Sequence, residues 1–223
     1  KAAANARILS KPVSHKGILS AQKIDQDNLI VIGSSTGGTE ALKTILTRLP
    51  AQIPPILIVQ HIPAVFSEAF ANRMDTLCPF RVTEARDGDI VEPSHVYVAP
   101  GGKQMKVVKK NNKLQIVITD DAPVNRHKPS VDYLFDSVEM LKPAKLVSVI
   151  LTGMGGDGAR GMKKLRDIGA STIAQNEESC VVFGMPREAI KLGGAEKIIH
   201  LDQIADEIVN LIKEKSSKMS AAH

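Results

Sequence analysis

From residue 28 onward, short apolar runs alternate with segments in which apolar residues recur every three to four positions. The runs at 29–32 ("LIVI"), 55–61 ("PILIVQH") and 144–153 ("AKLVSVILTG") are nearly continuous in Val, Ile and Leu. Strands that are apolar on both faces are typical of a parallel sheet with helices packed on each side. We therefore predict an α/β domain, doubly wound, with a mainly parallel sheet and helices on both faces.

The segments between the apolar runs have helical spacing. After the first run, apolar residues recur with helical spacing at Ala41, Leu42, Ile45, Leu46 and Leu49, and we predict a helix over 37–48. Toward the C-terminus, two further strands are predicted at 171–176 and 196–201. The remaining predicted helices cover 67–77, 157–169, 185–193 and 203–214.

The stretch from residue 95 to residue 120 has a different pattern. The run 95–100 ("HVYVAP") leads into two alternating segments that meet at Asn111 and Asn112. Asparagine tolerates a positive φ angle, which tight turns between antiparallel strands require. We predict an antiparallel hairpin there, added to the parallel sheet.

The two ends of the chain differ from its body. Residues 1–27 are rich in Ala, Ser and Lys without a sustained apolar period, which is typical of a linker or tether and equally of a flexible terminus. Of the formal net charge of +5, five basic against two acidic residues give +3 in 1–27, and three against one give +2 in 213–223. The predicted domain, residues 28–212, is therefore neutral, and 213–223 are predicted to be a tail.

Composition excludes several classes of function. A neutral body with 3% aromatic residues and no Trp does not fit a nucleic-acid binder, which needs a basic patch or a stacking platform. No apolar run reaches the roughly 18–20 residues of a membrane span, and no signal-peptide pattern is present. Cys78 and Cys180 lie outside any C-x-x-C motif, which argues against a disulfide framework or a zinc site. We expect a cytoplasmic protein with no metal, cofactor, nucleic acid or membrane insertion.

The segment 29–42 ("LIVIGSSTGGTEAL") places a glycine-rich turn between a strand and a helix. It is a poor Walker A loop, because Thr39 and Glu40 stand where Lys and a hydroxyl residue are required. It is also a poor dinucleotide fingerprint, because Ser35 replaces the middle glycine. Residues 33–37 do match G-x-S-x-G, a turn that presents a serine hydroxyl above a sheet. A plain turn capped by Ser or Thr is the alternative.

A serine nucleophile needs a base, and the base needs an orienting carboxylate. In open α/β sheets such groups gather beyond the carboxyl ends of the strands. His61 directly follows a predicted buried strand, and His127, in the loop "PVNRHKPS", is the second candidate for the base. Asp157 follows the strand that ends near residue 151, although it could instead be an ordinary N-cap. Ser35, His61 and Asp157 are thus predicted at one edge of the sheet.

Six segments of the chain together resemble the catalytic domain of the CheB family, the chemoreceptor protein-glutamate methylesterases. They are "IGSSTGGTEAL", "IVQHIP", "APGGKQM", "PVNRHKPSVDYLF", "VILTGMGGDGARGM" and "AQNEESCVVFGMPREAI". The resemblance implies a serine hydrolase with Ser35 as nucleophile, His61 as base and Asp157 as the third member of a catalytic triad. It also implies that Thr36 and Met154 lie at the site and help to form the oxyanion hole. Ser34 departs from relatives that often carry Ala, and we expect no effect on the chemistry.

The same resemblance implies a substrate and partners. The substrates would be glutamyl methyl esters on the cytoplasmic helices of methyl-accepting chemoreceptors, and receptor glutamines would be deamidated by the same route. Residues 1–27 would be the linker to an N-terminal receiver domain that is absent from this chain. Arg126 lies in a Pro-bounded loop, where it is a candidate for positioning an acidic receptor helix or is simply a solvated loop arginine.

Some alternatives remain open at this point. Cys180 is a rival nucleophile, although a buried free thiol is the more common case. A non-catalytic nucleotide- or phosphate-binding module could use the same glycine turn, and measured ATP or NAD affinity without ester hydrolysis would favour it. An adaptor that only docks on receptor bundles would keep its function after Ser35→Ala.

Overall fold

The computed structural model describes residues 28–143 and 145–220, so the predicted linker at 1–27 lies outside the described residues. The strands are β1 (Asn28–Ser34), β2 (Ile56–Gln60), β3 (Arg81–Glu84), β4 (His95–Val98), β5 (Gln104–Lys110), β6 (Lys113–Thr119), β7 (Lys145–Ile150), β8 (Ser171–Gln175) and β9 (Lys197–Ile199). The helices are α1 (Gly38–Leu46), α2 (Ala64–Leu77), α3 (Val131–Leu141), α4 (Ala159–Asp167), α5 (Met185–Lys191) and α6 (Leu201–Ser220). Over these ranges, none of the helices has both the length and the hydrophobicity needed to cross a membrane.

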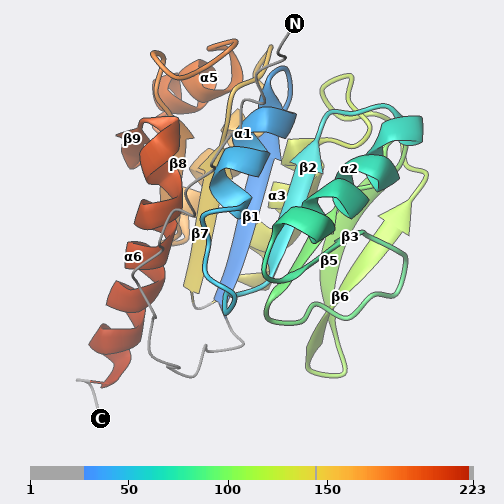
Figure 1. Ribbon diagram of the computed structural model, residues 1–223, viewed down its shortest axis with the longest axis horizontal. Coiled ribbons are helices and arrows are strands. Elements are labelled where there is room, and N and C mark those ends of the chain that lie inside the picture. Colours follow the sequence, from blue (N-terminus) through green and yellow to red (C-terminus); the bar gives the residue numbers. More distant parts are fainter. Residues whose placement is uncertain (1–27, 144, 221–223) are drawn as a thin grey trace, which may run out of the picture.

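Seven strands form one parallel sheet in the order β3-β4-β2-β1-β7-β8-β9. The chain first moves outward from β1 through β2, and later returns to the other side of β1 through β7 (Figure 1). In open α/β sheets, functional groups gather beyond the carboxyl ends of the strands at the point where the strand order reverses, which here lies at β1 and β7. The fold therefore brings the turn after β1 and the loop after β7 together at one edge of the sheet.

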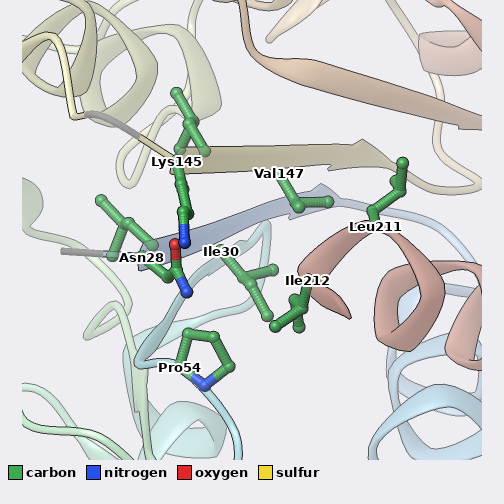
Figure 2. Close-up of a pocket in the computed structure, with 9 residues that line it drawn as sticks. Asn28, Ile30, Pro54, Lys145, Val147, Leu211 and Ile212 are labelled. Carbon is green, nitrogen blue, oxygen red and sulfur yellow. The ribbon is translucent and has the colours of Figure 1, made fainter. Parts of the chain in front are cut away.

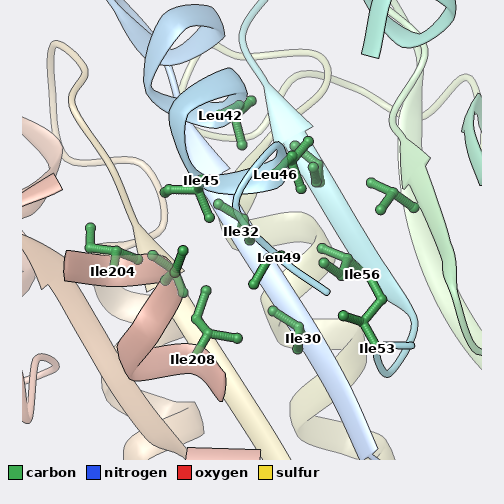
Figure 3. Close-up of a cluster of buried hydrophobic side chains, with 14 of the residues drawn as sticks. Ile30, Ile32, Leu42, Ile45, Leu46, Leu49, Ile53, Ile56, Ile204 and Ile208 are labelled. Carbon is green, nitrogen blue, oxygen red and sulfur yellow. The ribbon is translucent and has the colours of Figure 1, made fainter. Parts of the chain in front are cut away.

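Each face of the sheet is covered by its own set of elements, because alternate side chains of a strand point to opposite faces. On one face Ile30 and Ile32 of β1 pack with α1, α2 and α6, and Figure 3 shows Ile204 and Ile208 of α6 in this cluster. On the other face Leu29 packs with α3, α4, α5 and the hairpin. Every residue of β1 is buried, as the continuous apolar run requires. The predicted doubly wound α/β architecture is confirmed.

The structure also confirms the predicted hairpin and revises its surroundings. Strands β5 and β6 pair antiparallel and turn at Asn111 and Asn112, whose φ angles are 50° and 61°. The run 95–98, interpreted as leading into the hairpin, is instead β4, which lies inside the parallel sheet between β2 and β3. Strand β3 and helix α3 were not predicted. Helix α2 begins at Ala64, three residues earlier than predicted, and α6 continues to Ser220 through part of the predicted tail.

A small cavity lies at the amino ends of β1 and β7, at the end of the sheet opposite the turn after β1. Figure 2 shows Asn28, Lys145 and Pro54 around it, with Leu211 and Ile212 of α6 close by. Its volume is about 10 Å³, which is room for a single water molecule. This cavity is too small for a substrate or cofactor.

Candidate active site

The two adjacent serines at the end of β1 have different surroundings. Ser34 is fully buried, and its hydroxyl donates to Gln60 Oε1 at 2.7 Å. The amide of Gln60 in turn donates to the Ser35 carbonyl at 2.9 Å, which fixes the turn. Ser35 is half-buried just beyond the strand, and its hydroxyl has no hydrogen-bond partner among the described residues. The Ser35 hydroxyl is therefore available for chemistry, whereas the Ser34 hydroxyl is not.

Glycines allow the backbone to approach Ser35 closely from two directions. Helix α1 is preceded by Gly37 in the left-handed conformation, with φ 80° and no side-chain capping hydrogen bond, so the alternative of a Ser or Thr cap is not observed. In the loop after β7, a β-carbon added to Gly153 would lie 2.7 Å from Ser35 Cβ. The Ser35 N–H also donates to the Thr152 carbonyl at 3.0 Å. The turn after β1 and the loop after β7 are thus in direct contact.

His61 and Asp157 form a hydrogen-bonded pair at the same edge of the sheet. Ser34 and Gln60 are register partners in β1 and β2, so Ser35 and His61 leave the sheet side by side. The His61 Nε2 atom lies 2.8 Å from Asp157 Oδ2, with the carboxylate fully buried. The other ring nitrogen, His61 Nδ1, is buried and has no hydrogen-bond partner in the part of the chain described. The imidazole is therefore oriented through one nitrogen and unpaired at the other.

The Asp157 carboxylate is held by the start of helix α3. Oδ2 accepts from the Val131 N–H at 2.7 Å, and Oδ1 accepts from the Ser130 hydroxyl at 2.8 Å and from the Asp132 N–H at 3.2 Å. Burial raises the pKa of Asp157, but the hydrogen bonds from His61 and these groups outweigh it and lower the pKa to about 2. The N-cap of α4 is Gly158, so the alternative of Asp157 as a helix cap is wrong.

Two glycines bring α3 close enough for these contacts. A β-carbon on Gly158 would lie 2.5 Å from Val131 Cγ1, and one on Gly33 would overlap the same side chain. The contribution of α3 was not predicted, although the sequence contains a signal for this helix. Ser130 is a good N-cap, and apolar residues with helical spacing follow at Val131, Leu134, Phe135 and Val138.

A second buried carboxylate, Asp132, is connected to Asp157 through Asn125. The amide of Asn125 donates to Asp157 Oδ1 and to Asp132 Oδ2, both at 2.7 Å. Asp132 also accepts from the Gly161 N–H at 2.7 Å, and burial raises its pKa. Arg160 Nη2 donates to Asn125 Oδ1 at 2.7 Å and fixes which end of the amide faces the carboxylates. Asn125 therefore bridges two carboxylates that would otherwise repel each other.

The loop that carries Asn125 also brings His127 to the site. The His127 ring lies parallel to the His61 ring, with centroids 3.7 Å apart and 7° between the planes. Burial, and to a smaller extent His61, lowers the pKa of His127. Because Asp157 binds the His61 ring, His61 and not His127 has the orienting carboxylate that a base requires. Arg126 is exposed in the same loop, with a φ angle of 69°.

The remaining candidates lie around the serine or away from it. Thr36 is exposed directly after Ser35, and Met154 follows Gly153 with 72% of its surface exposed. Cys180 is half-buried, and burial raises the pKa of its thiol to about 11, which disfavours the thiolate that a nucleophile needs. Among residues 28–143 and 145–220, no group of three or more His, Cys, Asp or Glu side chains is placed to hold a metal ion.

Comparisons with known proteins agree on one family. The family model described as CheB methylesterase matches residues 30–208. A protein-glutamate methylesterase/protein-glutamine glutaminase 2 from Dechloromonas aromatica is 55% identical over 184 residues, which are 82% of this chain and 51% of that protein. A protein-glutamate methylesterase/protein-glutamine glutaminase from Salmonella typhi is 48% identical over 211 residues, 94% of this chain and 60% of that protein. The chain thus spans about half to three fifths of these relatives.

A solved structure is similar over nearly its whole length. The crystal structure of the Thermotoga maritima CheB methylesterase catalytic domain has a TM-score of 0.79 and 38% sequence identity. The match covers 82% of this chain and 97% of that domain. This chain is therefore similar over most of its length to a solved catalytic domain.

Proposed function

The chain belongs to the CheB methylesterase family, and from this premise we propose that it hydrolyses glutamyl methyl esters on chemoreceptors with Ser35, His61 and Asp157 as a catalytic triad. One observation carries the proposal. A histidine and a fully buried carboxylate, with Nε2 and Oδ2 2.8 Å apart, lie at the sheet edge beside a serine whose hydroxyl is unpaired within the described residues. This is the set of groups that activates a serine nucleophile.

In the proposed mechanism, Ser35 Oγ attacks the ester carbonyl and its proton passes to His61. Because Nε2 is hydrogen-bonded to Asp157, Nδ1 is the ring nitrogen that receives the proton. The Ser35–His61 hydrogen bond would form as substrate binds, since catalytic hydrogen bonds often tighten only in the complex. Asp157 stays ionised throughout, because its pKa of about 2 lies far below neutral pH, and it stabilises the imidazolium.

The oxyanion would be held by backbone donors on both sides of Ser35. Among the described residues, the N–H groups of Thr36 and Met154 have no hydrogen-bond acceptor. Thr36 precedes helix α1, whose N-terminus carries a partial positive charge. Each donor to an oxyanion is typically worth about 3 kcal/mol. Collapse of the tetrahedral intermediate expels methanol, His61 returns the proton to it, and water then releases glutamate from Ser35.

The names of the relatives also suggest the wider setting. They include protein-glutamine glutaminase activity, and we propose that this chain deamidates receptor glutamines by the same route, with ammonia as leaving group. We further propose that 28–212 is the catalytic domain, that 1–27 links it to a receiver domain, and that the enzyme acts on the cytoplasmic helices of methyl-accepting chemoreceptors. Arg126, exposed next to the Asn125 that binds Asp157, is proposed to contact acidic groups of the receptor.

Methanol release from methylated receptor tests the proposal. Wild type should release methanol, Ser35→Ala should lose the activity, and Ser34→Ala should keep it, because the Ser34 hydroxyl is buried against Gln60. Loss of activity in Ser34→Ala alone would mean that Ser34, and not Ser35, is the nucleophile. Binding of ATP or NAD without any ester hydrolysis would favour a regulatory binding module instead.

A further inference from the structure

His127 stacks on the His61 imidazole but makes none of the contacts expected of a base. The two rings are nearly parallel, with centroids 3.7 Å apart. The carboxylate of Asp157 binds His61 Nε2, and no hydrogen bond of the His127 side chain is present among the described residues. His127 therefore touches the proposed base through its face alone.

The loop that carries His127 is fixed at several points. Val124 and His127 exchange two backbone hydrogen bonds, of 3.1 and 2.9 Å, across a turn whose central residues both have positive φ angles. The fully buried Gln104 donates to the His127 carbonyl at 3.2 Å. Asn125, in the same turn, donates to Asp157 Oδ1. The backbone that positions His127 is thus tied to the same carboxylate that binds His61.

The two contacts of His61 restrain different motions of the ring. The hydrogen bond to Asp157 Oδ2 sets the direction of Nε2 but lets the ring rotate about the line that joins the two atoms. A parallel ring at 3.7 Å blocks that rotation, because the tilted imidazole would collide with the His127 face. The direction of the unpaired Nδ1 is therefore set by both partners together.

We infer that His127 is a positioning residue that holds the plane of the His61 ring and so aims Nδ1 at Ser35. The inference rests on the proposed function, since it assigns His61 the role of base. Among the described residues, the titratable groups of other elements that lie near the His127 ring are His61 and Asp157. On its own loop, the Lys128 ammonium lies 2.6 Å from Asp120 Oδ1. A neutral aromatic face also attracts the imidazolium that forms when His61 accepts a proton.

The test compares His127→Ala with His127→Phe, because Phe keeps an aromatic face and cannot titrate or donate a hydrogen bond. Both variants are assayed on methylated receptor and on a small activated ester such as p-nitrophenyl acetate. We expect His127→Ala to lower kcat about 10- to 100-fold on both substrates with little change in KM, the loss typical of a misplaced catalytic group. We expect His127→Phe to stay within about threefold of wild type.

A second readout does not depend on catalysis. Relaxation of ¹³C-labelled histidine rings, measured by NMR, should show greater mobility of the His61 ring in His127→Ala, and wild-type mobility in His127→Phe. Thermal unfolding of both variants shows whether either has lost its fold.

The outcomes separate this inference from the proposed function. Unchanged kcat and unchanged ring mobility in His127→Ala overturn the inference, and so does a His127→Phe variant as impaired as His127→Ala, which would indicate a chemical task for the imidazole. A change in KM for receptor alone would also overturn it, by making His127 a receptor contact. If wild type hydrolyses neither ester, the proposed function fails, while the NMR measurement still decides whether His127 restrains the ring.

Discussion

Because Gly153 lies against Ser35, adding one methyl group at residue 153 should displace the proposed nucleophile. In Gly153→Ala, the new β-carbon would lie 2.7 Å from Ser35 Cβ and 3.0 Å from Ser35 N, and would overlap Met185 Sδ. The Ser35 backbone cannot shift freely, because its N–H donates to the Thr152 carbonyl and its carbonyl accepts from the Gly38 N–H at 2.8 Å. The loop and the turn must therefore move apart.

The size of that movement follows from the distances. Ordinary van der Waals contact begins at 3.4 Å, so a separation of 2.7 Å must grow by about 0.7 Å or more. A misplacement on the order of 1 Å costs about 100-fold in rate, and overpacking of this kind destabilises by about 1–3 kcal/mol. We expect Gly153→Ala to lower kcat by about 30- to 100-fold while the protein remains folded.

The assay is methanol release from methylated receptor, with thermal unfolding measured in parallel. Gly156→Ala is the matched control, because it lies in the same loop and its β-carbon would meet Glu188 at 3.4 Å, an ordinary contact. The control should keep nearly full activity. Equal kcat values for Gly153→Ala and wild type, or equal losses in both variants, would refute the reasoning.

Other predictions follow from the groups around the triad. The folded-state pKa of Asp157, about 2, lies below its ordinary value of 3.8. Ionised Asp157 therefore adds about 2 kcal/mol to the free energy of unfolding above pH 4, and this stabilisation is lost as the pH falls toward 2. The free energies of unfolding of wild type and Asp157→Asn, measured with urea, should accordingly differ at pH 7 and converge in acid. Equal stability at pH 7 would contradict a stabilising role for ionised Asp157. Asn125→Gly tolerates the φ of 52° but removes the amide between two carboxylates, so kcat should fall at least tenfold, and an active variant would contradict the bridge. Arg126→Ala should raise KM for receptor a few-fold without affecting a small ester, and an unchanged kcat/KM on receptor would end that proposal. Cys180→Ser should retain kcat, because the thiol pKa of about 11 leaves little thiolate, and inactivity would revive the rival nucleophile.

The central strands could be predicted because their burial on both faces leaves an unmistakable pattern. Every position of β1, β2 and β7 is buried, which matches the apolar runs after residues 28, 55 and 144. Strand β3 could not be found in this way, since it is a four-residue edge strand with one buried position. The strand 95–98 was assigned to the wrong neighbour, because pairing partners in a parallel sheet are set by tertiary packing and not by local sequence.

The candidate catalytic residues could be predicted from the sequence, but the residues that hold Asp157 in place could not. Ser35, His61 and Asp157 follow central strands, and the rule that functional groups gather at the carboxyl edge selects them. The groups that hold Asp157 come from Asn125 and residues 130–132, which lie 25 to 32 positions away in the sequence. Such contacts depend on where helix α3 packs against the sheet, and this position cannot be predicted from the residues next to Asp157 in the sequence.

The most direct measurement is covalent labelling of the nucleophile. Wild type, Ser35→Ala, Ser34→Ala and His61→Ala are incubated with a fluorophosphonate, a reagent that modifies activated serines, and the modified peptide is identified by mass spectrometry. We predict one adduct per chain at Ser35, in wild type and in Ser34→Ala, and a loss of labelling in His61→Ala. An adduct at Ser34 or Cys180, or undiminished labelling of Ser35 without His61, would contradict the triad.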